Sequence, residues 1–386
     1  MSALVHEKNI YMLLILIFLT SLLVVAFAIP PIILLAFEKR LFDDPTESRK
    51  VHQHIVPNLG GVAIFTGFLF SACLFIPPTL LPQANILMAA GLILFMTGLK
   101  DDMIGLSPLK KFSAQTVSAA IIAFIANIRI KDLHGLLGIE TLNEYASIVF
   151  TIIFIVAIIN AFNLIDGIDG LAASLGIMLS LTYAFIFFQS GEIGWAYLSI
   201  SLTGALVGFL FFNITPARIF MGDSGSLLLG FIAAVLSIKF INLAAISQLN
   251  FGLIPITSSL SVVFAILIIP IFDTTRVFTL RILKGNSPFV ADSNHTHHRL
   301  LDLGLSHMQS TLVLTLINVM FVVMAIFFQR LGDVLLLPLI AGAVLVSNFA
   351  LTIYVWRVRN KPAKPTFHLK KEKTFGEKVL EFTSEN

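Results

Sequence analysis

The chain has 386 residues, of which 57% are hydrophobic and only 12% are charged, and its formal net charge at pH 7 is +3. A soluble domain carries about 25% charged residues, so this composition excludes an ordinary soluble domain. The small net charge gives no reason to expect a nucleic-acid partner. The single cysteine excludes an intrachain disulfide.

The apolar runs predict an all-α polytopic membrane protein with about eleven transmembrane helices. Several runs reach about 18 residues or more, the length that spans a bilayer. In chain order the predicted spans cover residues 10–37, 60–77, 84–99, 113–128, 145–162, 171–189, 195–212, 225–243, 253–272, 311–329 and 334–356. We expect a single transmembrane catalytic domain over residues 1–356 and a basic cytoplasmic tail over 357–386.

The distribution of lysine and arginine predicts the orientation of these spans. Most of the 25 basic residues lie in the loops that follow the odd-numbered spans and in the tail. Under the positive-inside rule these loops and the C-terminus are cytoplasmic, and the N-terminus is outside. The expected location is therefore the inner (plasma) membrane, which the chain crosses many times.

Five polar clusters also follow odd-numbered spans, and each should therefore lie at the cytoplasmic face. They cover residues 49–61, 101–111, 160–170, 220–226 and 295–299. Because successive clusters are separated by two membrane crossings, their shared side is unlikely to arise by accident. The pattern predicts an active site at this face of the bilayer.

The acidic residues in these clusters favour a hard cation. Asp101, Asp102 and Asp166 could simply cap helix starts, where carboxylates meet free N–H groups. That interpretation explains the adjacent pair poorly, because neighbouring carboxylates repel each other unless a cation or a pKa shift relieves them. Mg²⁺ binds one or two carboxylates and leaves its other positions to water and substrate phosphates. A metal with basic side chains beside a lipid surface indicates phosphoryl transfer.

Three histidines lie within four residues, at 295, 297 and 298. Zinc would require further ligands, and the sequence has neither an HExxH pattern nor a second cysteine to supply them. Hydrogen bonding to a phosphate or to a sugar hydroxyl is the favoured role, with a solvated cluster as the alternative.

Taken in order, the clusters resemble those of the polyprenyl-phosphate N-acetylhexosamine-1-phosphate transferases, glycosyltransferase family 4. The resemblance extends from Arg49 to Arg299, and the His-x-His-His-Arg-Leu pattern at 295–300 resembles the branch that uses UDP-GlcNAc and undecaprenyl phosphate. It implies a Mg²⁺-dependent (alternatively Mn²⁺-dependent) glycosyl-1-phosphate transferase. Such an enzyme moves N-acetylhexosamine 1-phosphate from a UDP-sugar to the polyprenyl phosphate lipid, releases UMP and starts a cell-envelope glycan.

The resemblance also implies roles for individual residues. Asp101, Asp102 and Asp166 are the expected catalytic acids, and Asp223 and Asn163 are the expected metal ligands. The expected substrate-binding residues are His52, Lys111, Asp169, Phe220, His295, His297, His298 and Arg299. Within this set Asp169 and Phe220 correspond to uracil contacts, and Lys111 to a pyrophosphate contact.

Other functions remain open at this point. A secondary transporter could use interfacial acids as ion sites, although such proteins favour charges near the midplane and repeated halves. An intramembrane aspartyl protease and a CDP-alcohol phosphotransferase fit the motifs less well. The choice of hexosamine, the glycan pathway, a homodimeric state and a covalent intermediate are not decided by the sequence.

Overall fold

The computed structural model describes residues 2–39, 56–283, 285 and 296–359. The chain divides into two compact units, Met1–Val346 and Ser347–Asn386. Within the described residues the second unit consists of the C-terminal part of one long helix. The first unit contains all the other helices and the candidate site.

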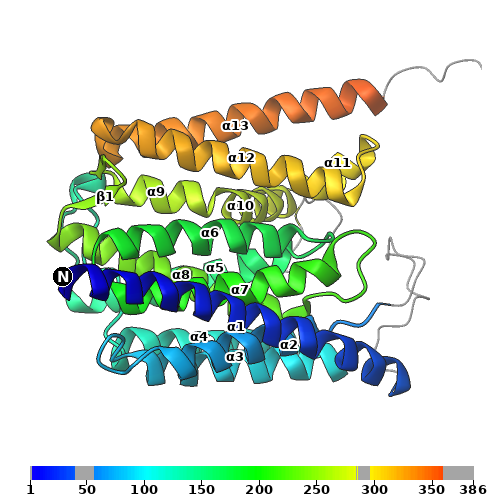
Figure 1. Cartoon of the computed structure of the whole chain (residues 1–386). Coiled ribbons are helices and arrows are strands. Elements are labelled where there is room, and N and C mark those ends of the chain that lie inside the picture. Colours follow the sequence, from blue (N-terminus) through cyan, green and yellow to red (C-terminus); the bar gives the residue numbers. More distant parts are fainter. Residues whose placement is uncertain (1, 40–55, 284, 286–295, 360–386) are drawn as a thin grey trace, which may run out of the picture. The chain divides into compact units, whose positions relative to one another are not determined.

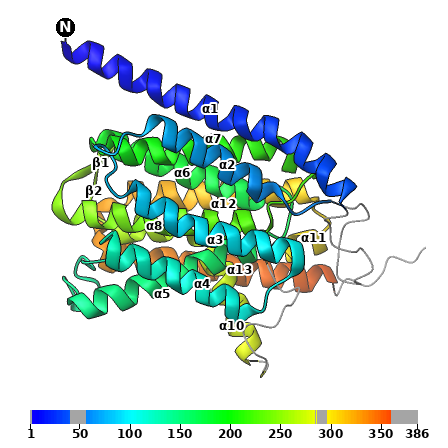
Figure 2. The ribbon, with the colours of Figure 1, turned by 90° about the horizontal axis from the view of Figure 1, so that it is seen from below.

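The first unit is almost entirely helical (Figures 1 and 2). Its elements up to the middle of the chain are α1 (Ser2–Glu38), α2 (Gly60–Phe75), α3 (Ala84–Ile104), α4 (Pro108–Ala120) with a π-helical turn (Ile121–Ile125), a 3₁₀ turn (Leu136–Gly138), α5 (Glu144–Ile165), α6 (Leu171–Gln189) and α7 (Ile193–Asn213). They are followed by α8 (Gly222–Ile246), β1 (Leu249–Phe251), β2 (Ile254–Ile256), α9 (Ser259–Ile266), α10 (Ile268–Leu283), α11 (Thr296–Asp302), α12 (His307–Phe327), a 3₁₀ turn (Gln329–Leu331) and α13 (Gly332–Arg359).

Within the described ranges, seven helices are long and apolar enough to cross a membrane, or up to eight if the bent pair α9 and α10 forms one span. The prediction of an all-α polytopic membrane protein is confirmed. The count of eleven spans and the placement of the termini on either side of the membrane stay predictions.

Two helices, α5 and α12, begin at side-chain caps. Asn143 accepts the backbone N–H of Ala146 at 2.9 Å at the start of α5, and Ser306 and Gln309 form a reciprocal capping box at the start of α12. A helix start has N–H groups without intrahelical partners, so each cap fixes where its helix begins.

Helix α8 forms the core of the first unit. It packs against α2, α3, α5 and α6, and 83% of its most apolar 18-residue window is buried. The packing against α3 is close enough to require glycine, because a Cβ on Gly98 would lie 2.5 Å from the backbone of Asp223 and Ser224. The most enclosed helix of the unit therefore begins directly beside the end of α3.

The ninth predicted span differs from the structure. In place of one helix over 253–272, β1 and β2 form an antiparallel hairpin, and α9 and α10 follow with a bend of 72° between them. Pro270 has no N–H to donate to the carbonyl of Ile266. The buried Asn318 amide of α12 donates to that carbonyl at 3.3 Å and to the carbonyl of Ala265 at 3.0 Å. A break inside an apolar region is tolerated because a neighbouring helix satisfies its carbonyl groups.

Candidate active site

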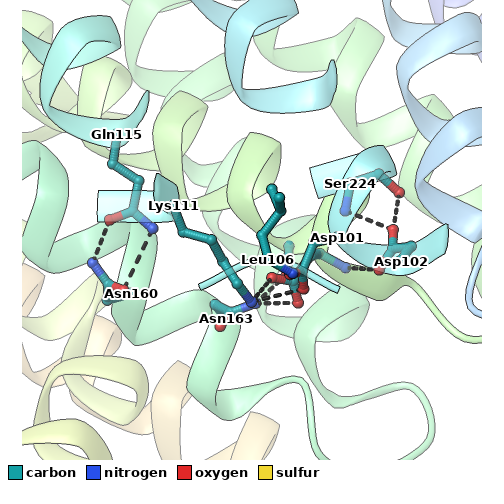
Figure 3. Close-up of polar contacts among 10 residues, drawn as sticks. Asp101, Asp102, Leu106, Lys111, Gln115, Asn160, Asn163 and Ser224 are labelled. Atoms are coloured by element: carbon teal, nitrogen blue, oxygen red, sulfur yellow. Dashed lines mark hydrogen bonds and ion pairs between the residues drawn. The ribbon is translucent and has the colours of Figure 1, made fainter. Parts of the chain in front are cut away.

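Four helix ends meet at the candidate site. Asp101 and Asp102 lie near the end of α3, Lys111 in the first turn of α4 and Asn163 in the last turn of α5 (Figure 3). Asp223 lies in the first turn of α8. These residues come from three of the five predicted clusters. Direct side-chain contacts join them, so three of the five clusters meet at one place in the fold.

Lys111 bridges two carboxylates that are far apart in the sequence. Its Nζ donates to Oδ2 of Asp101 at 2.7 Å and to Oδ2 of Asp223 at 2.7 Å. The remaining oxygen of Asp101 accepts the backbone N–H of Leu106 at 2.7 Å. The side chain of Asp223 is 20% exposed and that of Lys111 is 24% exposed, so both are accessible to a small solute. The ammonium group offsets the repulsion between the two acids.

Asn163 approaches Asp223 from the other side. Its Nδ2 donates to Oδ1 of Asp223 at 2.9 Å and to Oγ of Ser226 at 3.0 Å. Both carboxylate oxygens of Asp223 therefore have a polar partner, Lys111 on one and Asn163 on the other. This arrangement places Asp223 at the centre of the cluster.

Asp102 has a different environment from its neighbour Asp101. Its Oδ1 accepts the backbone N–H of Asp223 at 2.7 Å, and its Oδ2 accepts the N–H and the hydroxyl of Ser224 at 3.0 Å and 2.7 Å. Figure 3 shows Asp102 directed toward Ser224 and Asp101 on the side of Lys111. Asp102 thus caps the start of α8, a helix remote in sequence, as the capping alternative anticipated.

The start of α8 depends on Gly222. This residue has φ +70°, and a Cβ on it would lie 2.2 Å from the carbonyl oxygen of Asn58 and 2.7 Å from Oδ2 of Asp102. Only glycine combines this left-handed conformation with so close an approach.

Asp166 immediately follows α5, on the chain that leads from Asn163 to α6. Burial of the carboxyl and then repulsion from Asp223, Asp102 and Asp169 raise the pKa of Asp166 to about 8. In the absence of a cation this carboxyl is mostly protonated at pH 7.

Asp169 and Phe220 lie in loops beside the cluster. Oδ2 of Asp169, a residue only 4% exposed, accepts the N–H of Ala217 at 3.2 Å, and Oδ1 lies 3.4 Å from Nδ1 of His307. The backbone of Phe220 pairs with Pro57 and Gly60, each at 2.9 Å. The loops that precede α2 and α8 therefore hold Asp169 and Phe220, the two residues predicted to contact uracil.

The histidine cluster is described in part. His52 and His295 lie outside the described residues, as does the side chain of His297, while His298 is half-buried and Arg299 is buried in α11. The N–H of Thr296, the first residue of α11, donates to Oδ1 of Asp273 at 2.6 Å. Asp273, which is 2% exposed, is absent from the sequence-based set. The sequence contained one indication of its importance: Asp273 is a lone acid in the apolar sequence Ile268–Thr274. An acidic side chain in a membrane helix is energetically costly and usually functional.

The donor set at Asp223 suits a hard cation. Mg²⁺ uses one or two protein carboxylates and completes its shell with water and phosphate oxygens. Partly exposed carboxylate oxygens of Asp223 and Asp101 meet at a single ammonium group, so a cation can be accepted there. In the described part of the chain no group of three or more His, Cys, Asp or Glu side chains is arranged to hold a metal ion, so water and substrate oxygens would have to complete the shell of a cation at Asp223.

Comparisons with known proteins point to one family. The model of glycosyl transferase family 4 matches residues 84–241, which include α3, α5 and the start of α8. The chain is 36% identical over 313 residues, 80% of its length and 83% of the relative's, to a probable undecaprenyl-phosphate N-acetylglucosaminyl 1-phosphate transferase of Bacillus subtilis (strain 168). It is 33% identical over 322 residues to the decaprenyl-phosphate N-acetylglucosaminephosphotransferase of Mycobacterium tuberculosis (strain ATCC 25618 / H37Rv), covering 77% of this chain and 78% of that one.

A more distant relative is the undecaprenyl-phosphate alpha-N-acetylglucosaminyl 1-phosphate transferase of Escherichia coli (strain K12), 26% identical over 71% of this chain and 72% of its own. The similarity to the first two relatives exceeds 30% identity and covers most of both chains in each case. The family implied by the ordered polar clusters is thereby confirmed: this chain belongs to glycosyl transferase family 4.

Proposed function

We propose that the protein transfers N-acetylglucosamine 1-phosphate (GlcNAc-1-phosphate) from UDP-GlcNAc to undecaprenyl phosphate and releases UMP. The activities for which its relatives are named support the sugar phosphate and the polyprenyl acceptor. The observation that carries the proposal is the cluster in which Lys111 joins Asp101 to Asp223 at the ends of membrane helices. A water-soluble donor and a lipid acceptor can meet only at such an interface.

The reaction exchanges one phosphoanhydride bond for another. An oxygen of the lipid phosphate attacks the β-phosphorus of the UDP-sugar, the bond to the α-phosphate oxygen breaks, and UMP leaves with the electron pair. Because one such bond replaces another, the step is close to balanced in energy and requires no ATP. Catalysis then consists mainly of positioning and of neutralising charge on the phosphate oxygens.

The residues of the cluster divide this work. Asp223, with Asn163 beside it, would hold Mg²⁺, which when bound offsets negative charge on the diphosphate. Lys111, already placed between two acids, would turn its ammonium group to a phosphate. Asp101 and Asp166 remain the acids proposed to act on the acceptor phosphate, and Asp102 would act through the start of α8.

The donor would extend from this cluster toward the loops that hold Asp169 and Phe220, the residues proposed to contact uracil. Arg299 and His298 in α11 would approach the sugar and the diphosphate. The site would face the cytoplasm, where UDP-sugars are made, and the product would be the first lipid-linked intermediate of a cell-envelope glycan.

The test is an assay of purified protein in detergent with undecaprenyl phosphate, Mg²⁺ and a panel of UDP-sugars, with identification of the lipid product. UDP-GlcNAc should give a lipid-linked GlcNAc diphosphate and one UMP per product. Asp223→Ala should reduce product to background without unfolding the protein. Asp132→Ala is the matched control, because Asp132 lies in the loop before α5, at the other end of that helix from Asn163. Full activity of Asp223→Ala would refute the assignment of the site.

A further inference from the structure

Two amides, the buried Gln115 and the half-buried Asn160, join α4 to α5 beside the candidate active site. Nδ2 of Asn160 donates to Oε1 of Gln115 at 2.7 Å, and Nε2 of Gln115 faces Oδ1 of Asn160 at 3.4 Å (Figure 3). Gln115 is 2% exposed. Asn160 also donates to the carbonyl of Val156, one turn earlier in α5, at 2.7 Å. Neither side chain is among the predicted catalytic, metal-binding or substrate-binding residues.

The Gln115–Asn160 pair limits how α4 and α5 can rotate and slide against each other. A buried amide that loses its partner pays a desolvation penalty, which adds to the close packing of the apolar side chains around it. The Gln115–Asn160 contacts are the only side-chain hydrogen bonds between α4 and α5 in the described part of the chain. They therefore define the rotation and the register of these two helices relative to each other.

The same two helices carry both partners of Asp223. Lys111 precedes Gln115 by four residues in α4, and Asn163 follows Asn160 by three residues in α5, so each lies about one turn from the pair and on the same helix face. Lys111 contacts one carboxylate oxygen of Asp223 and Asn163 contacts the other. A rotation of α4 against α5 would move these two groups apart around Asp223.

We infer that Gln115 and Asn160 are positioning residues, which set the spacing of Lys111 and Asn163 around Asp223 without touching the reacting atoms. The inference rests on the proposed role of Asp223 and its two partners. It predicts that the pair can be replaced without loss of the fold but not without loss of turnover.

The experiment separates stability from positioning. Replacing both partners of a part-buried hydrogen bond by apolar side chains of similar size can be nearly neutral for stability, so the double variant Gln115→Leu with Asn160→Leu should keep its unfolding temperature in detergent. Its kcat should fall by about ten- to hundredfold, because a displacement near 1 Å can cost about a hundredfold in rate. Its KM for UDP-GlcNAc should change much less, since the donor-binding loops are not altered.

Rescue and control variants accompany the double replacement. Exchanging the two residues, Gln115→Asn with Asn160→Gln, keeps an amide pair of the same combined length and should restore most of kcat. Ser118→Ala, which removes a buried hydrogen bond from α4 to the carbonyl of Ala90 in α3, should leave kcat near that of the unmodified protein.

One result would overturn the positioning role of the pair, and a different result would overturn the proposed site at Asp223 on which that role rests. A folded double leucine variant with unchanged kcat overturns the role of the pair while Asp223→Ala stays inactive; an active Asp223→Ala overturns the proposed site itself. If the double leucine variant fails to fold, Gln115→Met serves instead, because Asn160 keeps its bond to Val156. Unchanged kcat in Gln115→Met overturns the inference, and a fall of about tenfold or more supports it.

Discussion

The carboxylate of Asp102 accepts the backbone N–H of Asp223 at 2.7 Å and so fixes where α8 begins. Asp102 lies near the end of α3 and Asp223 near the start of α8, toward opposite ends of the region that matches the family model. Their hydrogen bond holds these two segments in contact. Adjacent acids that look equivalent in the sequence therefore have separate tasks. Asp101 shares the ammonium group of Lys111, and Asp102 orients the helix that presents Asp223.

Substitutions of Asp102 should distinguish a helix-capping role from a direct part in the reaction. Loss of a capping side chain costs about 1 kcal/mol, so Asp102→Ala should lower the free energy of unfolding by roughly that amount or more. Asp102→Asn keeps an acceptor oxygen. It should therefore lower the free energy of unfolding and the rate of product formation less than Asp101→Asn does. Thermal unfolding and product formation, measured on the same preparations, check this. A folded Asp102→Asn protein as inactive as Asp223→Ala would instead indicate a direct part in the reaction.

Lys111→Met should have opposite effects on cation binding and on catalysis. The ammonium of Lys111 lies 2.7 Å from an oxygen of Asp101 and of Asp223, so in donor-free protein it competes with a divalent cation. Two unit charges 4 Å apart interact by about 4 kcal/mol near a protein surface, so its removal should tighten Mn²⁺ binding by about tenfold or more. Activity should fall because a phosphate partner is lost. Titration followed by paramagnetic resonance measures the first effect, and unchanged or weaker Mn²⁺ binding would argue against competition.

Asp166 should make the metal-free protein less stable as pH rises. Its pKa is about 8 in the folded chain and 3.8 as the ordinary value, so between these values the folded state holds a proton that the unfolded state has released. Stability therefore decreases with rising pH across this window and reaches its low plateau above pH 8. Asp166→Asn should flatten the decrease and unfold at a higher temperature than the unmodified protein above pH 8.

Thermal unfolding in EDTA, followed from about pH 5 to pH 9 in a detergent that does not titrate, measures this dependence. Asp132→Asn serves as the control for a general change in charge. Equal slopes for the unmodified and the Asp166→Asn proteins would contradict the raised pKa.

Gly222→Ala should be far more damaging than Gly105→Ala. Both glycines have φ +70°, a value that ordinary residues rarely adopt. A Cβ on Gly105 meets no atom within 4 Å, whereas one on Gly222 would lie 2.2 Å from the carbonyl of Asn58. The difference between the two variants in unfolding temperature and activity isolates the effect of close packing at the start of α8. Equal effects would show that only the backbone conformation matters there.

By itself the sequence determined the class of the protein and predicted a set of candidate site residues. Apolar length is a local property, matched to the thickness of a bilayer, so every predicted span overlaps a helix of the structure even where its ends differ. The order of the polar clusters identified the family, because chemistry-bearing residue types at the ends of successive apolar runs can be recognised without their distances. Asp101, Asp102, Lys111, Asn163 and Asp223 were all in the predicted set.

Only the tertiary structure decided which of these groups are in contact. The division of labour between Asp101 and Asp102, the double contact of Lys111 and the amide pair of Gln115 with Asn160 depend on how α3, α4, α5 and α8 pack. The break after Ile266 likewise needs the amide of Asn318, which comes from another helix. Such contacts join residues as many as 122 positions apart. Their geometry follows from close packing between helices, and no local pattern in the chain encodes it.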